Sequence, residues 1–260
     1  MKLLCPRQAT SPASLPGAAW VVASSYGGGL VSGDRLSLQV EVRPNACAVV
    51  TTQASTKVYH ADAAGTPATQ TLDARVATGG LLLLTPEPIV CFADAVYEQR
   101  QRIDLDPGAG LVLLDWFTAG RVGSAVAGGV GERWAFRRYA SRNRVIIDGT
   151  PRLHDALVLD GEAQPLGDPL TVGRFDVFAT LVLAGEPVRD AADALLDTWS
   201  RAELDCDAAV QLGVGRGESP DAPTVLRLAG TSTQAVQRQL ASLLDFLRPR
   251  LGRGLWDRKP

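Results

Sequence analysis

Three strand-turn-strand patterns follow one another in the first half of the chain. In residues 35–43 apolar and polar side chains alternate strictly, Pro44-Asn45 follows, and a second apolar segment begins near Cys47. A period of two is typical of a half-buried β-strand, and Pro-Asn is typical of a turn. The turns near residues 44, 78 and 107 are 34 and 29 residues apart. This repetition favours stacked β-units, although an ordinary β-sandwich with similar hairpins also fits.

Composition limits the classes of protein that the chain can belong to. Of its 260 residues 46% are hydrophobic and 21% are charged, which is typical of a globular core rather than of disorder. A net charge of −2 gives no electrostatic reason to expect nucleic acid or an anionic membrane as a partner. The longest apolar runs, such as residues 81–84, are too short to span a bilayer. We therefore expect a globular protein that binds neither.

The cysteines and the start of the chain bear on its location. Four scattered cysteines without a CxxC pair indicate free thiols in a reducing compartment. The absence of acidic residues before Asp34, together with Lys2, Arg7 and several serines, weakly resembles a transit peptide. Arginines are few, however, and a strand is expected from about Ala19. We expect a cytoplasmic protein whose residues 1–18 are a disordered or variable start.

A glycine cluster at residues 27–29, followed by Gly33, raises the question of nucleotide binding. Gly28 and Gly33 have the spacing of a phosphate loop, but Asp34 stands where that loop needs a lysine and would repel a phosphate. A dinucleotide fingerprint also fails, because Ser32 replaces its last glycine and an alternating strand follows instead of a helix. The alternative is a hairpin or bulge where backbones pass closely.

The segments GGGLVSGDRL, VTTQ and STKVY, within residues 26–59, resemble the urease accessory protein family UreD, also called UreH, and most of all its eukaryotic branch. An acidic residue near a Gly-Arg pair, here Asp115 and Arg121, extends the resemblance, which covers about residues 26–251. The family's fold implies a mainly β protein with a stacked, β-helix-like core and two α-helices in the C-terminal third. We expect one domain at residues 19–252 and a C-terminal tail at residues 253–260.

Helix signals are confined to the last third of the chain. Residues 190–199 place apolar side chains on one side of a helix. A longer helix is expected from the Thr231-Ser232-Thr233 cap to Leu251, where Pro249 and Gly252 end it. Upstream, Trp134 and Phe136 are expected on one face of a strand.

Three aspartates are the candidate metal ligands. Asp34, Asp115 and Asp155 match acidic positions that the resemblance links to a route for nickel through the protein's interior. Oxygen ligands bind a divalent transition metal weakly, which suits an ion in transit. For Asp34 a solvent-facing turn aspartate is an equal alternative. Asp115 lies in an apolar strand, where a carboxylate is costly unless it is paired or functional.

A second set of residues carries the family motif and is expected in a polar interior or at an interface. A run of hydroxyls beside one lysine is hard to explain by packing, and buried hydroxyls need hydrogen-bond partners. The motif and interface residues are Gly33, Thr51, Thr52, Thr56, Lys57, Tyr59 and Arg121.

No catalytic or structural metal pattern is present in the sequence. It has two histidines, His60 and His154, no GxSxG or HExxH motif and no close set of four N/S ligands. The resemblance implies a non-catalytic scaffold that bridges apo-urease to UreF, and through UreF to UreG. It would aid nickel delivery in GTP-dependent maturation, with no tightly bound cofactor. The alternatives are a small-molecule hydrolase that uses the Asp and Thr/Lys cluster, and a purely structural adaptor.

Overall fold

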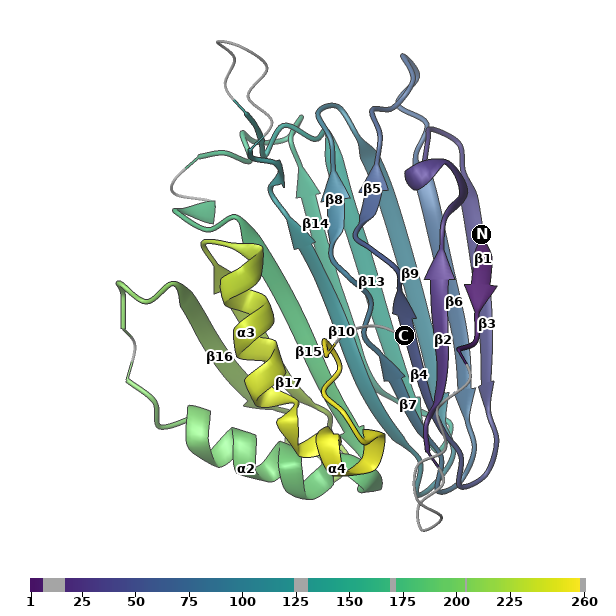
Figure 1. Cartoon of the computed structure of the whole chain (residues 1–260). Helices are drawn as coiled ribbons and strands as arrows, with labels where there is room; N and C mark the ends of the chain where they lie inside the picture. Colours follow the sequence, from purple (N-terminus) through teal and green to yellow (C-terminus); the bar gives the residue numbers. More distant parts are fainter. Residues whose placement is uncertain (7–16, 124–130, 169–171, 204, 258–260) are drawn as a thin grey trace.

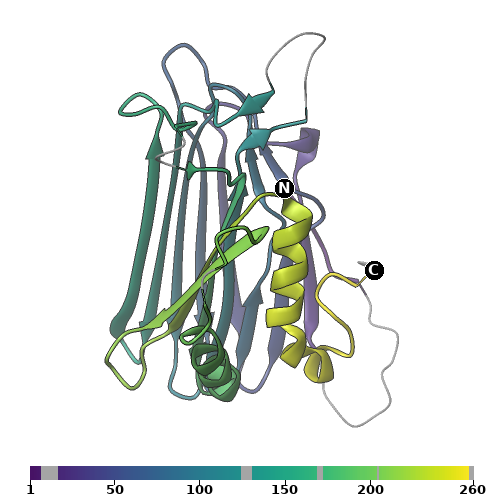
Figure 2. The same cartoon turned by 90° about the vertical axis from the view of Figure 1, so that its left-hand side faces the viewer.

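The computed structural model describes residues 1–6, 17–123, 131–168, 172–203 and 205–257, which form three layers. A large sheet A lies between a second sheet B and a layer of helices (Figures 1 and 2). The predicted mainly β fold is confirmed.

Sheet A has ten strands. Its main path is, in order, β1 (Lys2–Leu4), β2 (Ala19–Ser24), β4 (Cys47–Thr52), β7 (Leu81–Leu84), β10 (Gly110–Thr118), β15 (Val177–Gly185), β17 (Thr224–Gly230) and β16 (Val210–Arg216). Two short strands extend it beside β10, namely β8 (Ile89–Cys91) and β5 (Thr56–Val58).

Sheet B has five strands in the order β14 (Thr150–Asp160), β13 (Arg138–Ile147), β9 (Val96–Leu105), β6 (Ala68–Val76) and β3 (Arg35–Val42). A two-stranded sheet pairs β11 (Gly120–Arg121) with β12 (Glu132–Arg133).

The chain alternates between the two sheets. The 34- and 29-residue spacings of the predicted turns reappear as the sequence separation between paired residues of neighbouring strands. In sheet A, Cys47 lies opposite Leu81 and Leu81 opposite Gly110 in parallel ladders, so that the partners are 34 and 29 residues apart. Sheet B has the same two offsets. The β-helix-like stack as a whole is not confirmed, because the later pairs β13–β14, β10–β15 and β15–β17 are antiparallel.

The central strands β7 and β10 of sheet A are buried on both faces, which explains their continuous apolar runs. All four residues of β7 are buried. Leu82 and Leu84 face sheet B and join Leu111 and Leu113 of β10 in the core between the sheets. Side chains of the opposite parity contact the helices instead, in a cluster that includes Leu83, Leu114, Leu181, Leu228 and Leu240. Within the part of the chain that the structure describes, no element covers the outer face of sheet B (Figure 2).

The helices cover the β15–β17 half of sheet A. They are α2 (Arg189–Trp199), α3 (Thr233–Leu243) and α4 (Arg248–Leu251), with the 3₁₀ turns η2 (Glu186–Val188) and η3 (Asp245–Leu247). A further 3₁₀ turn, η1 (Tyr26–Gly28), follows β2 and lies outside this layer. The predicted first helix is confirmed. No helix in the described ranges has the length and apolar content needed to cross a membrane.

Three expectations are corrected in detail. The long C-terminal helix is broken after Leu243, because Leu244 leaves the helical conformation and η3 intervenes before α4. Trp134 and Phe136 are buried but lie between β12 and β13, since Trp134 has a positive φ of 56° that a strand does not tolerate. Residues 2–4 of the expected disordered start form β1, which pairs with β2 at the sheet edge.

Truncating the core between the sheets should destabilise the fold strongly. Leu113 is fully buried there, so Leu113→Ala removes contacts and leaves a cavity. We expect a loss of about 2–5 kcal/mol in the free energy of unfolding by urea titration. Val158→Ala, at a side chain that is 46% exposed, is the control and should change stability by less than about 0.5 kcal/mol. Equal effects of the two substitutions would contradict this packing.

Candidate functional site

Polar side chains interrupt the core between the sheets at neighbouring positions of β9 and β13. Alternation points every second residue of these strands inward, and parallel pairing sets the inward residues side by side. Towards one end of the strands these residues are apolar, as with Ile103 beside Val145. Further along they become polar, and these polar inward residues are Gln99, Gln101, Ser141 and Asn143.

Asp115 of β10 faces these polar residues from sheet A and accepts hydrogen bonds from several of them. Its Oδ2 accepts from Ser141 Oγ at 2.5 Å and from Asn143 Nδ2 at 2.8 Å. Its Oδ1 accepts from Gln99 Nε2 at 3.2 Å and, more weakly, from the Tyr139 hydroxyl at 3.4 Å. The network compensates for placing a carboxylate in an apolar strand.

The environment of Asp115 acts on its ionisation in two directions. Burial raises the pKa of this carboxyl, because taking the charged form out of water is costly, and the nearby Asp155 raises it further. The hydrogen bonds from Ser141, Asn143 and Gln99 lower the pKa and partly oppose these effects. Asp115 is enclosed by protein yet not wholly inaccessible, since part of its surface faces a cavity.

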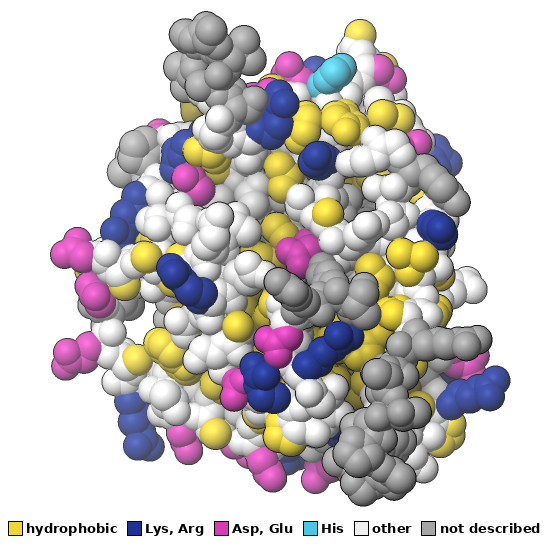
Figure 3. Space-filling model, viewed as in Figure 1, with side chains coloured by type: hydrophobic (Ala, Val, Ile, Leu, Met, Phe, Trp, Pro, Cys, Tyr) yellow, Lys and Arg dark blue, Asp and Glu magenta, His cyan; other side chains and the backbone are white. Residues whose placement is uncertain are grey.

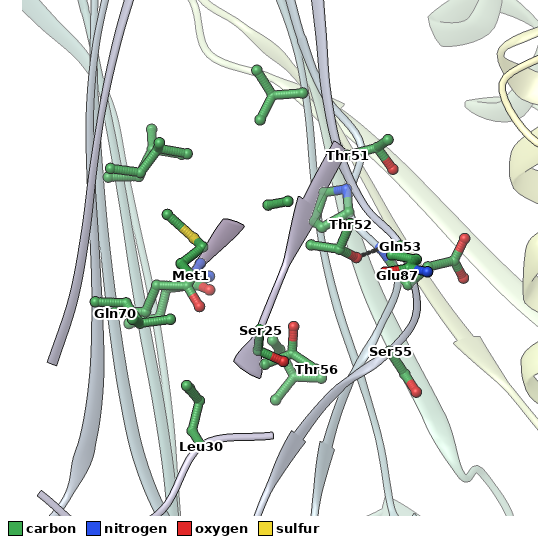
Figure 4. A pocket seen from close by; sticks show the side chains of 18 of the residues that line it. Met1, Ser25, Leu30, Thr51, Thr52, Gln53, Ser55, Thr56, Gln70 and Glu87 are labelled. Atoms are coloured by element: carbon green, nitrogen blue, oxygen red, sulfur yellow. Dashed lines mark hydrogen bonds between the residues drawn. The ribbon is translucent and has the colours of Figure 1, made fainter. Parts of the chain in front are cut away.

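That cavity, of about 380 Å³, lies between the two sheets near β1, β2 and β3. Sheet B contributes Gln70, Gln99 and Gln101 to its wall, and sheet A contributes Thr51 and Asp115. Figure 4 shows Gln70 and Met1 on one side of the space, facing Thr51 and Thr52 on the other. The polar wall can hold water, which needs two to four polar partners.

Asp155 of β14 continues the polar network away from the cavity. It is 7% exposed, and Asn143 Nδ2 lies 3.4 Å from its Oδ2. Its other oxygen pairs with the guanidinium of Arg227 on β17, whose side chain is 60% exposed. A chain of polar contacts therefore connects the cavity to the surface through Asp115, Asn143, Asp155 and Arg227.

Asp34 takes no part in this network. Its Oδ2 accepts from Val31 N at 3.0 Å, and it closes a turn that contains Gly33 with a φ of 81°. Within the described ranges, no group of three or more His, Cys, Asp and Glu residues could hold a metal ion. The structure thus brings Asp115 and Asp155 close together and leaves Asp34 in a turn.

The hydroxyl-rich segment borders the cavity. Thr51 is buried and donates its hydroxyl to Thr85 O at 2.7 Å, while the Thr52 Oγ1 accepts from Glu87 N at 2.9 Å (Figure 4). Thr56 also lines the cavity. Lys57 is exposed. Its backbone passes closely by Gly29, where an added Cβ would lie 2.7 Å from Lys57 O.

Tyr59 and Arg121 both contact the ring of Phe92. The ring of Tyr59 meets that of Phe92 edge-on at 5.0 Å, and the Arg121 guanidinium stands 4.2 Å from the centre of the same ring. Glu132 binds Arg121 and accepts from Ala93 N at 3.1 Å. These contacts join β11 and β12 to sheet A, so both motif residues have structural partners.

The sequence interpretation identified the two interior aspartates but missed most of their partners. None of Gln99, Gln101, Ser141, Asn143 and Arg227 was among the candidate site residues. The available signal was the alternation of the strand, because Gln99 and Gln101 stand at the same alternate positions of β9 as the buried Ile103 and Leu105 and therefore point to the same side. Polar residues in the buried phase of a strand indicate an internal polar site.

The raised pKa of Asp115 predicts a pH-dependent stability. The neutral carboxyl favours the folded state, and this contribution is lost as the pH rises through the raised native pKa. Urea unfolding measured from about pH 4 to about pH 8 should therefore show the wild type becoming less stable relative to Asp115→Asn as the pH rises. Val158→Ala, at an exposed position without a titratable group, is the control and should differ from the wild type by a constant amount. Parallel curves for the Asp115 pair would contradict the prediction.

Comparison with known proteins gives consistent matches over the whole chain. The family described as UreD urease accessory protein matches residues 2–257. A urease accessory protein UreD of Sorangium cellulosum is 42% identical over 100% of this chain and 76% of its own length. The corresponding protein of Anaeromyxobacter sp. is 38% identical over 98% of this chain and 82% of its own.

Plant proteins are also similar to the chain. Urease accessory protein D of Oryza sativa subsp. indica is 37% identical over 76% of this chain and 61% of its own length. The motif resemblance, the family match and the full-length relatives all agree. The chain belongs to the UreD family of urease accessory proteins.

Proposed function

We propose that the chain is a non-catalytic scaffold that bridges apo-urease to UreF and UreG and offers nickel a weakly binding path during GTP-dependent urease maturation. Membership of an accessory-protein family implies partnership with other components of that process. The single observation that carries the nickel part is the half-buried Asp115 carboxylate beside a polar cavity.

The donor set around Asp115 supports weak and reversible binding of a cation. Carboxylate and amide oxygens are hard ligands, and they hold a divalent transition metal less tightly than thiolate or imidazole groups do. The cavity wall supplies such oxygens from Asp115, Gln70, Gln99 and Gln101. An ion that must leave again is served by modest affinity at several neighbouring positions.

Asp155 supports a second position along the same path. It is joined to Asp115 through Asn143, and its ion pair with Arg227 reaches the surface. A divalent cation at Asp155 would compete with the Arg227 guanidinium for the carboxylate. In the proposed route Asp34 lies near one entrance of the path. This position stays a prediction, because the Asp34 side chain accepts a hydrogen bond within its own turn and, among the described residues, has no contact that connects it to Asp115 or Asp155.

The hydrolase alternative gains no support from the Thr/Lys cluster. The Thr51 hydroxyl is committed to a backbone carbonyl and Lys57 is exposed, so neither is placed as a nucleophile with its base. A purely structural adaptor differs from the proposal in having no nickel role. We place the activity in the cytoplasm, with apo-urease and UreF as direct partners.

Removing the two interior charges should slow nickel delivery without dissolving the scaffold. Because the pKa of Asp115 is raised, its neutral form is tolerated, and Asn closely resembles that form. In activation of apo-urease with UreF, UreG, GTP, bicarbonate and limiting nickel, the Asp115→Asn, Asp155→Asn double variant should be roughly tenfold slower than the wild type.

The control is assembly with UreF and apo-urease, which should survive in the double variant. Normal activation under limiting nickel would refute the conduit and leave a structural adaptor. Activation that proceeds equally well without the chain would refute the scaffold as well.

Substitution of Lys57 tests assembly with the partners separately from folding. Since its side chain is exposed, Lys57→Ala should change stability by less than about 0.5 kcal/mol. If the motif forms an interface, the same variant should bind UreF or apo-urease several-fold more weakly in a pull-down titration. Exposed Lys2→Ala serves as the matched control. Unchanged binding of the Lys57 variant to both partners would remove Lys57 from the interface.

A further inference from the structure

The outer face of sheet B carries a concentrated positive charge that the fold itself does not require. On β9 and β13 the residues next to the inward polar ones point outward, and four of them are arginines. Parallel register sets Arg100 directly beside Arg142, and Arg102 directly beside Arg144. We call this group, Arg100, Arg102, Arg142 and Arg144, the arginine face. Like charges in directly opposed positions destabilise a sheet, so their presence calls for another cause.

The acidic partners within the chain do not neutralise the arginine face. Arg102 pairs with Asp104 at 2.8 Å, while Arg100 lies 3.7 Å from Glu98, a carboxylate that also pairs with Arg138. Arg142 and Arg144 form no ion pair with the described residues. The exposed His154 lies directly opposite Arg144 on β14 and adds no acidic partner to this part of the face.

The arginine face is accessible and belongs to a broad surface. The side chains of Arg100 and Arg102 are 67% and 53% exposed, and no described helix or strand covers this side of sheet B (Figure 2). Five strands of about ten residues give a surface of roughly 600 Å², near the roughly 800 Å² that each partner buries in a standard interface. On the opposite face of the molecule, over the helices, acidic and basic side chains are intermixed (Figure 3).

We propose that the arginine face docks a carboxylate-rich surface of a protein partner in the maturation assembly. Guanidinium groups bind carboxylates with two parallel hydrogen bonds, and arginine is enriched at protein interfaces. The acidic residues Asp73, Asp104 and Glu98 lie around the arginines. They suit a partner whose surface is acidic at its centre and carries both basic and acidic side chains around that centre. This proposal rests on the proposed scaffold function for the identity of the partner and is independent of the nickel path.

A nucleic acid suits this face less well. Among the outward positions of β3, β6, β9, β13 and β14 there is no Phe, Tyr or Trp on which a base could stack, since Tyr97 and Tyr139 both point inward. The acidic residues beside the arginines would repel a phosphate backbone, and the whole chain has a net charge of −2.

The test is the R142E/R144E double variant, titrated separately with purified apo-urease and with purified UreF at low and high salt. Binding of at least one of them should weaken by about tenfold or more at low salt, with a smaller difference at high salt. R35E, at an exposed position of β3 two strands away from β9 on the same outer face, carries the same type of charge change and should bind as the wild type does. Wild-type binding of the double variant to both proteins would overturn the proposal.

Measuring the melting temperature beside binding separates loss of folding from loss of charge complementarity. R142E and R144E each place a carboxylate opposite a remaining arginine, so the melting temperature should stay unchanged or rise while binding falls.

If the wild type binds neither apo-urease nor UreF, the scaffold function fails, and binding of poly-L-glutamate then tests the arginine face by itself. Loss of poly-L-glutamate binding in R142E/R144E would retain the acidic-partner surface, and equal binding would overturn it. Arginine-dependent binding of a single-stranded oligonucleotide or of anionic vesicles, without binding of poly-L-glutamate, would also overturn it.

Discussion

Burial of the central strands of sheet A on both faces is the constraint on which the rest of the structure depends. A strand buried on both faces has no polar side, and this accounts for the runs of leucine in β7 and β10. One set of these side chains requires sheet B and the other requires the helices, so neither outer layer is dispensable. The helices follow in sequence after most of the strands, and they complete a core that the strands cannot close alone.

Against this background the charge at Asp115 stands out. It occupies an inward position between Leu113 and Phe117, where packing would favour an apolar residue. Four donors from sheet B meet it, which shows that β9 and β13 are adapted to one carboxylate on β10. A half-satisfied polar network is costlier than an apolar core, and these four donors keep the carboxyl group satisfied.

The sequence predicted the elements whose signals are local. Alternation located β3, the 34- and 29-residue spacings reappear as register, and α2 begins within one residue of its expected start. The break after Leu243 was not predictable from the apolar stripe, because that stripe continues through Leu244 and Leu247 into α4. Nor could the sequence pair Asp155 with Arg227, since this contact joins residues 72 positions apart on facing sheets. The meeting of Asp115 and Asp155 depended likewise on how the sheets pack.

Two strands carry both halves of the proposed function. On β9 and β13 the inward positions hold the amide and hydroxyl groups around Asp115, and the intervening outward positions hold the arginine face. A strand has a side-chain period of two, so a register slip of one residue in either strand would exchange these two sets. The apolar pair Ile103 and Val145, at the buried end of the same ladder, opposes such a slip because it would lose its place in the core. The hydrophobic end of the ladder therefore fixes the position of the interior carboxylate partners and the spacing of the surface arginines at the same time.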